Sequence, residues 1–298
     1  MIPFVKDISF EYGACDQVSP LIRRVIARNP GPFTFTGTGT YIVGRGEVAV
    51  IDPGPEIDEH FDAILAAVAG ERVTHIVITH NHSDHAPLAL PLKARTGAPI
   101  YGCAVKGQVD ADEGGGALAD SHAAEVVPDV DLCGGGRIEG SGWTLEAIPT
   151  PGHTSNHLCF ALLEENALFT GDHIMGWSTT VITPPDGDMG QYMESLARVR
   201  ARNFETLWPT HGAPVRAVTP FIDAYIAHRR ARETQIEQAL AEGPAKILDL
   251  VPKLYVDVDK KLYPAAARSM LAHMIDLTRR GRLTTDGEPG PDNLYRLA

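Results

Sequence analysis

The sequence predicts an α+β protein with two parts, a large strand-rich part followed by a small helical part. Up to about residue 215, short β-branched runs lie between many of the 29 Gly and 22 Pro residues, as turn-rich chains require. Beyond that point, apolar residues recur at helical spacing. We therefore expect one domain over residues 1–216 and a second over 217–298, a division that a chain of 298 residues allows.

The strand-rich part opens with a hairpin pattern. Residues 40–43 and 48–51 are short β-branched runs separated by Gly44 and Gly46, and the second run ends at Asp52. Apolar residues at helical spacing follow over 61–68, and a buried strand over 73–79 leads directly into His80. Further elements are expected as strands over 99–102, 143–150, 157–163, 167–170 and 206–208, and as helices over 88–95 and 191–202. Asp188 is suited to cap the later helix.

The last part of the chain has a winged-helix pattern. Helices are expected over 220–242, 247–251 and 262–280, and two short strands over 283–285 and 294–297 flank a Gly/Pro-rich turn. Two arginine clusters on these helices are expected to lie on solvated faces: Arg229, Arg230 and Arg232, and Arg279, Arg280 and Arg282.

Cysteine spacing and hydropathy suggest an ordinary cytoplasmic protein. The four cysteines stand at 15, 103, 133 and 159 without a CxxC pair, so we expect neither a disulfide framework nor a thiolate zinc site. The first 20 residues lack the pattern of a signal peptide, and no apolar stretch is long enough for a membrane span.

The charge distribution argues against a polyanionic substrate. The net charge is −12, and residues 215–298 carry 13 Lys and Arg against 11 Asp and Glu. Neither part has the basic surplus that is usual in nucleic-acid binding. A dedicated nuclease is therefore disfavoured, although the charge does not exclude one.

One short segment carries most of the chemistry. Residues 79–85 read Thr-His-Asn-His-Ser-Asp-His, with four ligand-type side chains directly after an apolar strand. On a loop leaving a strand, His80 and His82 can converge on one metal while Asp84 and His85 turn towards a second. Imidazole and carboxylate ligands suit zinc, manganese or iron.

Three further motifs stand at the ends of expected strands. They present His153 after Pro151 and Gly152, Asp172 after Gly171, and His211 before Gly212. Each is weak alone, but together and in this order they indicate a metal centre. Asp172 is well placed to bridge two metals.

The series H-x-H-x-D-H, G-H-T, G-D and T-H-G resembles that of the metallo-β-lactamase superfamily over residues 30–215. The resemblance implies a four-layer αββα sandwich with its metals at one edge of the sheets. It assigns His80, His82 and His153 to one metal and Asp84, His85 and His211 to the other, with Asp172 between them. It also implies that Asp52, at a strand end, orients a ligand histidine.

The remaining histidines fall into two groups. His157 and His173 lie near the motifs, so His173 is a candidate to support the ligands, and His157, with Asn156, a candidate to contact substrate. The others have no motif context and are expected to be surface or core residues: His60, His75, His122, His228 and His273.

Within the superfamily, the chain is most similar to the group of the beta-lactamase-like protein 2 type, which joins this domain to a C-terminal winged-helix-like region. The similarity lies in residues 171–176, 179–181 and 188–196 and in the tail from Gly243 to Leu283, while residues 184–188 depart from it. For animal members of the group, the resemblance implies cleavage of single-stranded RNA. Specificity is expected to lie in the loops 107–122 and 174–190.

We therefore expect a hydrolase with two divalent metal ions, zinc by preference and manganese or iron as alternatives. A hydroxide bridging the metals would attack an ester, thioester, lactone or similar bond of a small substrate, with Asp84 and Asp172 as catalytic residues. Two alternatives stay open: a single-stranded RNA endonuclease, and a non-catalytic metal-binding regulatory or interaction protein. No membrane partner is expected, and a homodimer is compatible with the sequence.

Overall fold

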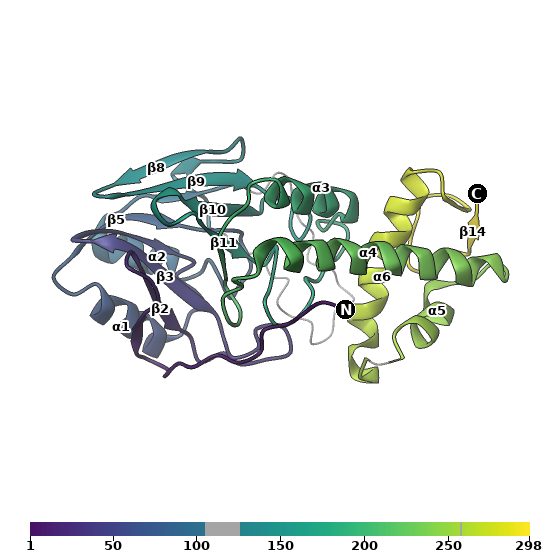
Figure 1. Ribbon diagram of the computed structural model, residues 1–298, viewed down its shortest axis with the longest axis horizontal. Coiled ribbons are helices and arrows are strands. Elements are labelled where there is room, and N and C mark those ends of the chain that lie inside the picture. The colour runs from purple at the N-terminus through teal and green to yellow at the C-terminus, as the bar shows by residue number, and fades with distance from the viewer. Residues whose placement is uncertain (105–125, 257) are drawn as a thin grey trace.

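The computed structural model describes residues 1–104, 126–256 and 258–298. The expected loop at 107–122, including His122, lies wholly outside the described residues. Figure 1 shows a strand-rich body joined by a long helix to a smaller helical part. Among the described residues, no helix combines the length and the apolar character needed to cross a membrane.

The first sheet has seven strands that run side by side in chain order. The strands are β1 Cys15–Gln17, β2 Ile22–Ile26, β3 Gly39–Arg45, β4 Glu47–Ile51, β5 Arg72–Val77, β6 Ile100–Gly102 and β7 Val130–Asp131. Pairing is antiparallel from β1 to β4 and parallel from β4 to β7. The expected hairpin is the β3–β4 pair. Because β4 and β5 are parallel, their carboxyl ends lie at the same edge of the sheet.

The second sheet has five strands in the order β12-β11-β10-β9-β8. Their bounds are β8 Gly136–Gly140, β9 Trp143–Pro149, β10 Leu158–Leu162, β11 Ala167–Gly171 and β12 Thr206–Pro209, with the short helix η2 Leu163–Glu165 after β10. Strand β10 is antiparallel to both β9 and β11, and β12 is parallel to β11. The carboxyl ends of β9, β11 and β12 therefore lie at the same edge of this sheet.

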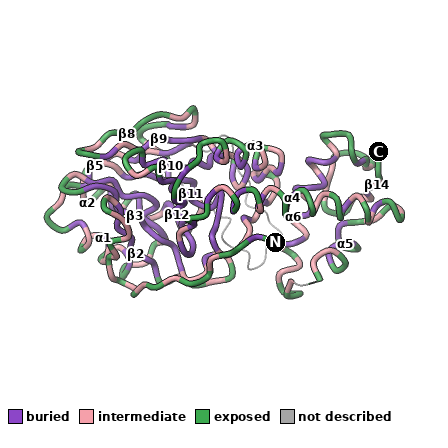
Figure 2. The backbone as a smooth tube through the Cα atoms, in the orientation of Figure 1, coloured by how far each residue is buried: buried purple, intermediate pink, exposed green. Residues whose placement is uncertain are grey.

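Alternating side chains on the strands build a four-layer αββα sandwich, as predicted. Tyr41 of β3 packs between the sheets against Phe160 and Phe169 of the second sheet. Its neighbour Ile42 points the other way, to the layer that holds α1 Asp58–Ala67 and α2 Ala89–Thr96. On the far side, α3 Met189–Arg200 and the start of α4 Val218–Ala241 cover the second sheet. Figure 2 shows the resulting buried interior. Asp188 caps α3, as expected, by accepting a hydrogen bond from the Gln191 amide at 3.0 Å.

The C-terminal part has the expected helices and hairpin. They are the second half of α4, then α5 Ile247–Leu254, the short helix η3 Lys260–Leu262, α6 Tyr263–Arg279, β13 Leu283–Thr285 and β14 Tyr295–Leu297. A separate apolar cluster holds them together, and Ile236 and Leu240 of α4 belong to it. Helix α4 thus contributes to two cores.

Two expectations are wrong. A disulfide joins Cys103 to Cys133, whose Cα atoms lie 4.6 Å apart. Their separation of 30 residues gave no signal, but the parallel pairing of β6 with β7 brings the two chain segments together. Arg229 is not solvated either: it is 3% exposed and donates to the Thr180 carbonyl, whereas its neighbour Arg230 is exposed.

Candidate metal centre

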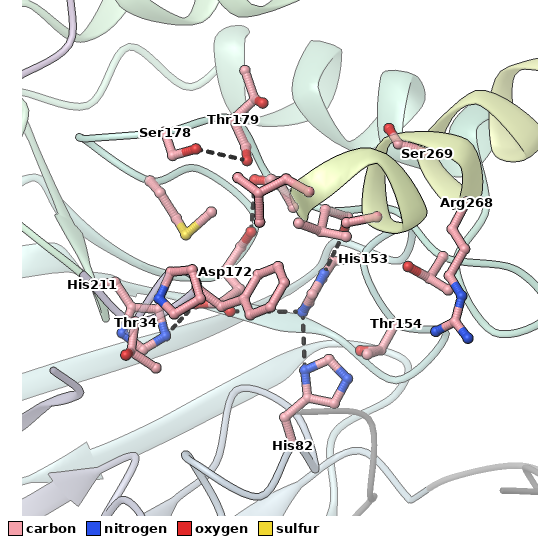
Figure 3. Close-up of a pocket in the computed structure, with 18 of the residues that line it drawn as sticks. Thr34, His82, His153, Thr154, Asp172, Ser178, Thr179, His211, Arg268 and Ser269 are labelled. Atoms are coloured by element: carbon pink, nitrogen blue, oxygen red, sulfur yellow. Dashed lines mark hydrogen bonds and ion pairs between the residues drawn. The ribbon is translucent and has the colours of Figure 1, made fainter. Parts of the chain in front are cut away.

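The expected site residues converge where the carboxyl ends of strands from both sheets meet. His80 and His82 follow β5, His153 follows β9, and His211 follows β12. Asp172 follows β11 directly after Gly171, which has a φ of +50°. These segments are far apart in the sequence, and only the two sheets packing together bring their ends to one place. Figure 3 shows part of this cluster.

The side chains form two groups whose possible ligand atoms lie within 4.8 Å of one another. One group is His80, His82, His153 and Asp172, and the other is Asp84, His85 and His211. In the first group, Nδ1 of His82 lies 2.9 Å from Nε2 of His80 and 3.1 Å from Nε2 of His153. Nitrogen ligands of a tetrahedral zinc ion, each about 2.0–2.1 Å from the metal, stand about 3.3 Å apart, so these spacings fit a cation between them.

Asp172 lies between the two groups. Its Oδ2 is 3.7 Å from Nε2 of His153, while its Oδ1 is 3.3 Å from Nε2 of His211 and 3.5 Å from Nε2 of His85. Oδ1 and Nε2 of His85 are buried polar atoms without a hydrogen-bond partner among the described residues. Buried polar atoms are rarely left unpaired, so a bound cation is the simplest partner for them.

The second group closes around Asp84. Its Oδ2 lies 3.0 Å from Nε2 of His211 and 3.3 Å from Nε2 of His85, and it accepts a hydrogen bond from the hydroxyl of Thr38 at 3.2 Å. The Thr38 hydroxyl in turn accepts a hydrogen bond from the side-chain amide of Asn29 at 3.0 Å. Neither residue could be predicted from the sequence, because an isolated asparagine or threonine before a strand has no distinguishing pattern.

Hydrogen bonds on the far side of four rings fix which nitrogen is free. Nδ1 of His85 donates to Asp52 at 2.9 Å, and Nδ1 of His80 faces the Thr79 hydroxyl at 3.0 Å. Nδ1 of His153 donates to the Val181 carbonyl at 2.7 Å, and Nδ1 of His211 faces the Gly37 carbonyl at 3.3 Å. With the proton on Nδ1, the lone pair of each Nε2 is directed into the cluster, which is the tautomer that a metal needs.

The histidine pKa values differ between the two groups of side chains. Burial, followed by the neighbouring imidazoles, holds the pKa of His80 well below its usual value and lowers that of His82 to about 3. For His85 burial acts in the same direction, but the carboxylates of Asp84, Asp172 and Asp52 together raise its pKa well above the usual value. The first group therefore offers neutral imidazoles at His80 and His82, whereas three carboxylates surround the His85 ring of the second group.

Asp52 lies behind the cluster, at the end of β4. Its carboxylate is 1% exposed and accepts hydrogen bonds from the Thr79 amide at 2.8 Å, the Thr79 hydroxyl at 2.9 Å and the Thr210 hydroxyl at 3.0 Å. Together with the bond from His85, these contacts tie the ends of β4, β5 and β12 to one side chain.

The other candidates occupy distinct places. His157 joins the Thr150 hydroxyl through Nδ1 at 2.8 Å and accepts from the Asp172 amide through Nε2 at 3.2 Å, so it supports the backbone of Asp172. His173 is buried against Tyr192, and burial lowers its pKa to about 3. Asn156 lines the cavity in front of the cluster and donates to the Cys103 carbonyl at 3.1 Å.

The remaining histidines among the described residues are surface or core residues, as expected. His60 and His273 are buried, His75 is half-buried and His228 is exposed. His60 lies behind the ligand loops, where its Nε2 faces the Thr40 hydroxyl at 2.8 Å.

A cavity of about 370 Å³ lies in front of the cluster. Its walls include the candidate ligands His82, Asp84, His153, Asp172 and His211, residues from the expected specificity loop 174–190, and the C-terminal part of the chain. In Figure 3, Arg268 and Ser269 are seen on helix α6, on the side of the cavity across from the cluster.

Comparison with known proteins identifies the family of each part of the chain. Residues 34–211 match the metallo-beta-lactamase superfamily, and residues 247–290 match the beta-lactamase associated winged helix domain. The chain therefore belongs to the metallo-β-lactamase superfamily, and it is a metal-dependent hydrolase with a C-terminal winged-helix domain.

Relatives of this chain carry names that point to different activities. The chain is 34% identical over 251 residues to a beta-lactamase-like protein 2 homolog of Caenorhabditis elegans, a match that covers 81% of this chain and 79% of that one. It is also 34% identical over 228 residues to an atrochrysone carboxyl ACP thioesterase of Paecilomyces divaricatus, covering 76% and 66% of the two chains. A beta-lactamase domain protein from Burkholderia ambifaria has the same fold, with a TM-score of 0.81 at 22% identity, covering 100% of this chain and 97% of that one.

Proposed function

We propose that the protein hydrolyses an ester, thioester, lactone or similar bond of a small substrate at a dinuclear metal centre. One metal would be held by His80, His82 and His153 and the other by Asp84, His85 and His211, with Asp172 between them. Zinc is our first choice, and manganese or iron would suit the same nitrogen and oxygen ligands. When bound, two such cations lower the pKa of water and polarise a carbonyl oxygen.

The chain's own residues then position the reactants. Asp84 faces the cavity, and Thr38 donates to one of its oxygens, so the carboxylate is oriented to accept a hydrogen bond from the attacking water. His153 and His211 are held by backbone carbonyls, and His157 holds the backbone of Asp172. We assign His157 this positioning role, because its ring is behind Asp172, and we keep Asn156, which lines the cavity, as the candidate substrate contact.

The observation that carries the proposal is the size and lining of the cavity in front of the cluster. At about 370 Å³ it is near the lower end of small-molecule pockets. Arg268 is the one Lys or Arg among the described residues of its lining, whereas an RNA strand needs a row of cations for its phosphates. The name of the Paecilomyces divaricatus relative, an acyl-carrier thioesterase, supports an acyl substrate.

The first experiment compares substrate classes on protein of measured metal content. A panel of thioesters, esters and lactones is assayed beside single-stranded RNA, with Asp84→Ala and His153→Ala as variants of the metal centre. We expect small-molecule turnover that both substitutions abolish. RNA cleavage lost in both variants would replace the proposal with the nuclease alternative, and bound metal without any turnover would favour the non-catalytic one. A cytoplasmic location and a homodimer stay predictions from the sequence.

A further inference from the structure

The C-terminal domain supplies one wall of the cavity. Its lining residues lie in the segment between α5 and η3, on η3 and on the first turns of α6, and they are Tyr255, Val258, Leu262, Ala265, Ala266, Arg268 and Ser269. Facing them are apolar residues of the catalytic domain, among them Phe33, Trp177, Val181 and Pro185. The cavity is therefore completed only when the two domains are together.

Helix α6 has one face for the cavity and another for its own core. Ala265 and Ser269 line the cavity, together with Ala266 at its border with the core, and their small side chains leave the cavity open. Met270 and Met274 pack into the C-terminal cluster instead. The large apolar side chains of α6 thus lie on its core face, and its small side chains lie on the face that lines the cavity.

Several contacts fix this wall in place. Arg279 near the end of α6 pairs with Asp188, the residue that caps α3. Arg232 of α4 donates to the Leu254 carbonyl, and its guanidinium lies 4.0 Å from the centre of the Tyr255 ring. These contacts tie the wall to α3 and α4, so it is positioned to limit the size of a substrate.

The cavity also has a polar end. Thr154 lines it beside His153, is 5% exposed, and has a hydroxyl without a hydrogen-bond partner among the described residues. Such a buried hydroxyl is suited to a polar group of a ligand. The polar end lies at the metal cluster, and the opposite wall is mainly apolar.

We infer that the winged-helix domain is the acyl-recognition half of the active site, in which Leu262 and Ala265 set the size of the apolar acyl group that is accepted. The inference rests on the proposed function and names its substrate class: esters or thioesters of an apolar, medium-sized acyl group. The scissile carbonyl lies at the cluster near Thr154, and the acyl group extends towards α6. Each further methylene that is buried contributes about a fourfold gain in affinity until the wall is reached.

The test is a chain-length profile on metal-loaded, full-length protein. N-acetylcysteamine thioesters and p-nitrophenyl esters of increasing acyl length are compared by kcat/KM. Ala265→Phe fills the cavity and is expected to lower kcat/KM at least tenfold for the longest accepted acyl groups, while acetyl substrates change less than about threefold. Leu262→Ala enlarges the cavity and shifts the optimum to longer chains. Leu248→Ala, at an exposed position on α5, is the control and leaves the profile unchanged.

The outcomes separate this inference from the proposed function. If the wild type hydrolyses these substrates but both variants keep its length profile, the inference is wrong and the proposed function stands. If no ester, thioester or lactone is turned over, the proposed function fails, and binding of cis-parinaric acid, with displacement by fatty acids of increasing length, tests the wall alone. Displacement that shifts in Ala265→Phe and Leu262→Ala supports the wall, and displacement that is unaltered in both overturns it.

Discussion

Single residues behind the ligands decide how well the metal centre is organised. The carboxylate of Asp52 accepts four hydrogen bonds, two of them from Thr79 and the others from Thr210 and His85. An ionised carboxylate is suited to this, since it only accepts hydrogen bonds and has two oxygens to do so. Its φ of +47° lies in the left-handed region, which aspartate and asparagine tolerate better than most residues.

The substitution Asp52→Asn tests what the negative charge of this residue contributes to the metal centre. The amide keeps the size and tolerates the backbone conformation, but it loses one acceptor oxygen and the negative charge beside His85. We expect a 10–100-fold loss in metal affinity or in kcat/KM, as is typical for residues that orient metal ligands. Metal retained after dialysis against a weak chelator, together with kcat/KM, measures this. Unchanged metal affinity and activity in the variant would show that the four hydrogen bonds serve folding alone.

Gly171 allows the close approach of Asp172 to the cluster. A Cβ at this position would lie 2.6 Å from Nε2 of His157 and 2.9 Å from the Cβ of Thr79. Gly46 also has a positive φ, but nothing lies within 4 Å of its Cβ position. Both Gly→Ala changes carry a backbone cost of about 1–2 kcal/mol, whereas only the one at Gly171 displaces ligand-supporting groups.

We therefore predict that Gly171→Ala loses metal and activity and that Gly46→Ala loses only stability. Denaturant unfolding gives the free energy of unfolding for both variants, and metal analysis gives the occupancy. The expected result is at least a tenfold drop in kcat/KM for Gly171→Ala and less than about a twofold drop for Gly46→Ala. Equal metal occupancy and activity in the two variants would argue against the steric account.

At the scale of elements, α4 organises the loop that supports His153. Tyr225 donates to the Met175 carbonyl at 2.6 Å and accepts from the Met175 amide at 3.2 Å, and Arg229 donates to the Thr180 carbonyl. The hydroxyl of Thr180 donates to the Asp172 carbonyl at 2.8 Å. One residue further, the Val181 carbonyl accepts from His153. Helix α4 therefore acts on the metal centre through one short loop.

Arg229→Ala tests this connection, with Arg230→Ala as its matched neighbour. Arg229 is 3% exposed, and its guanidinium lies 5.2 Å from the centre of the Tyr192 ring, whereas Arg230 is exposed. We expect faster amide hydrogen exchange over residues 178–181 and roughly tenfold lower kcat/KM for Arg229→Ala alone. Arg229→Lys retains the charge and should restore part of both. If the exchange of the loop is the same in all three variants, α4 does not hold it.

The elements and their motifs could be predicted where the signal is local. The strand before His80 and the Pro-Gly turn before His153 are visible in the sequence, because each places a ligand directly after an apolar run. The buried position of Arg229 and the pairing of Cys103 with Cys133 depend on packing between distant segments, so neighbouring residues give no sign of them. The cavity wall on α6 was missed for the same reason, since small residues in a helix usually only favour the helix.

At the scale of the whole molecule, α4 contributes side chains to the cores of both domains. Its first half places Phe221 and Ile222 in the core beneath the second sheet. Its second half places Ile236 and Leu240 in the C-terminal core. A boundary at 216–217, as the sequence predicts, would assign the whole helix to the C-terminal domain, although half of it completes the catalytic core. Separating the domains there would expose an apolar face on the sandwich.

We therefore predict that the full-length protein unfolds in one cooperative calorimetric transition. Phe221→Ala and Leu240→Ala each remove a large side chain from a different core and should each cost about 2–5 kcal/mol. Because α4 couples the cores, both variants should lower the temperature of the same single transition by several degrees, while Leu248→Ala, at an exposed position, should not. Two resolved transitions, one sensitive to Phe221→Ala and the other to Leu240→Ala, would show that the domains unfold independently. In that case the wall of the cavity could detach from the metal centre without unfolding of the sandwich.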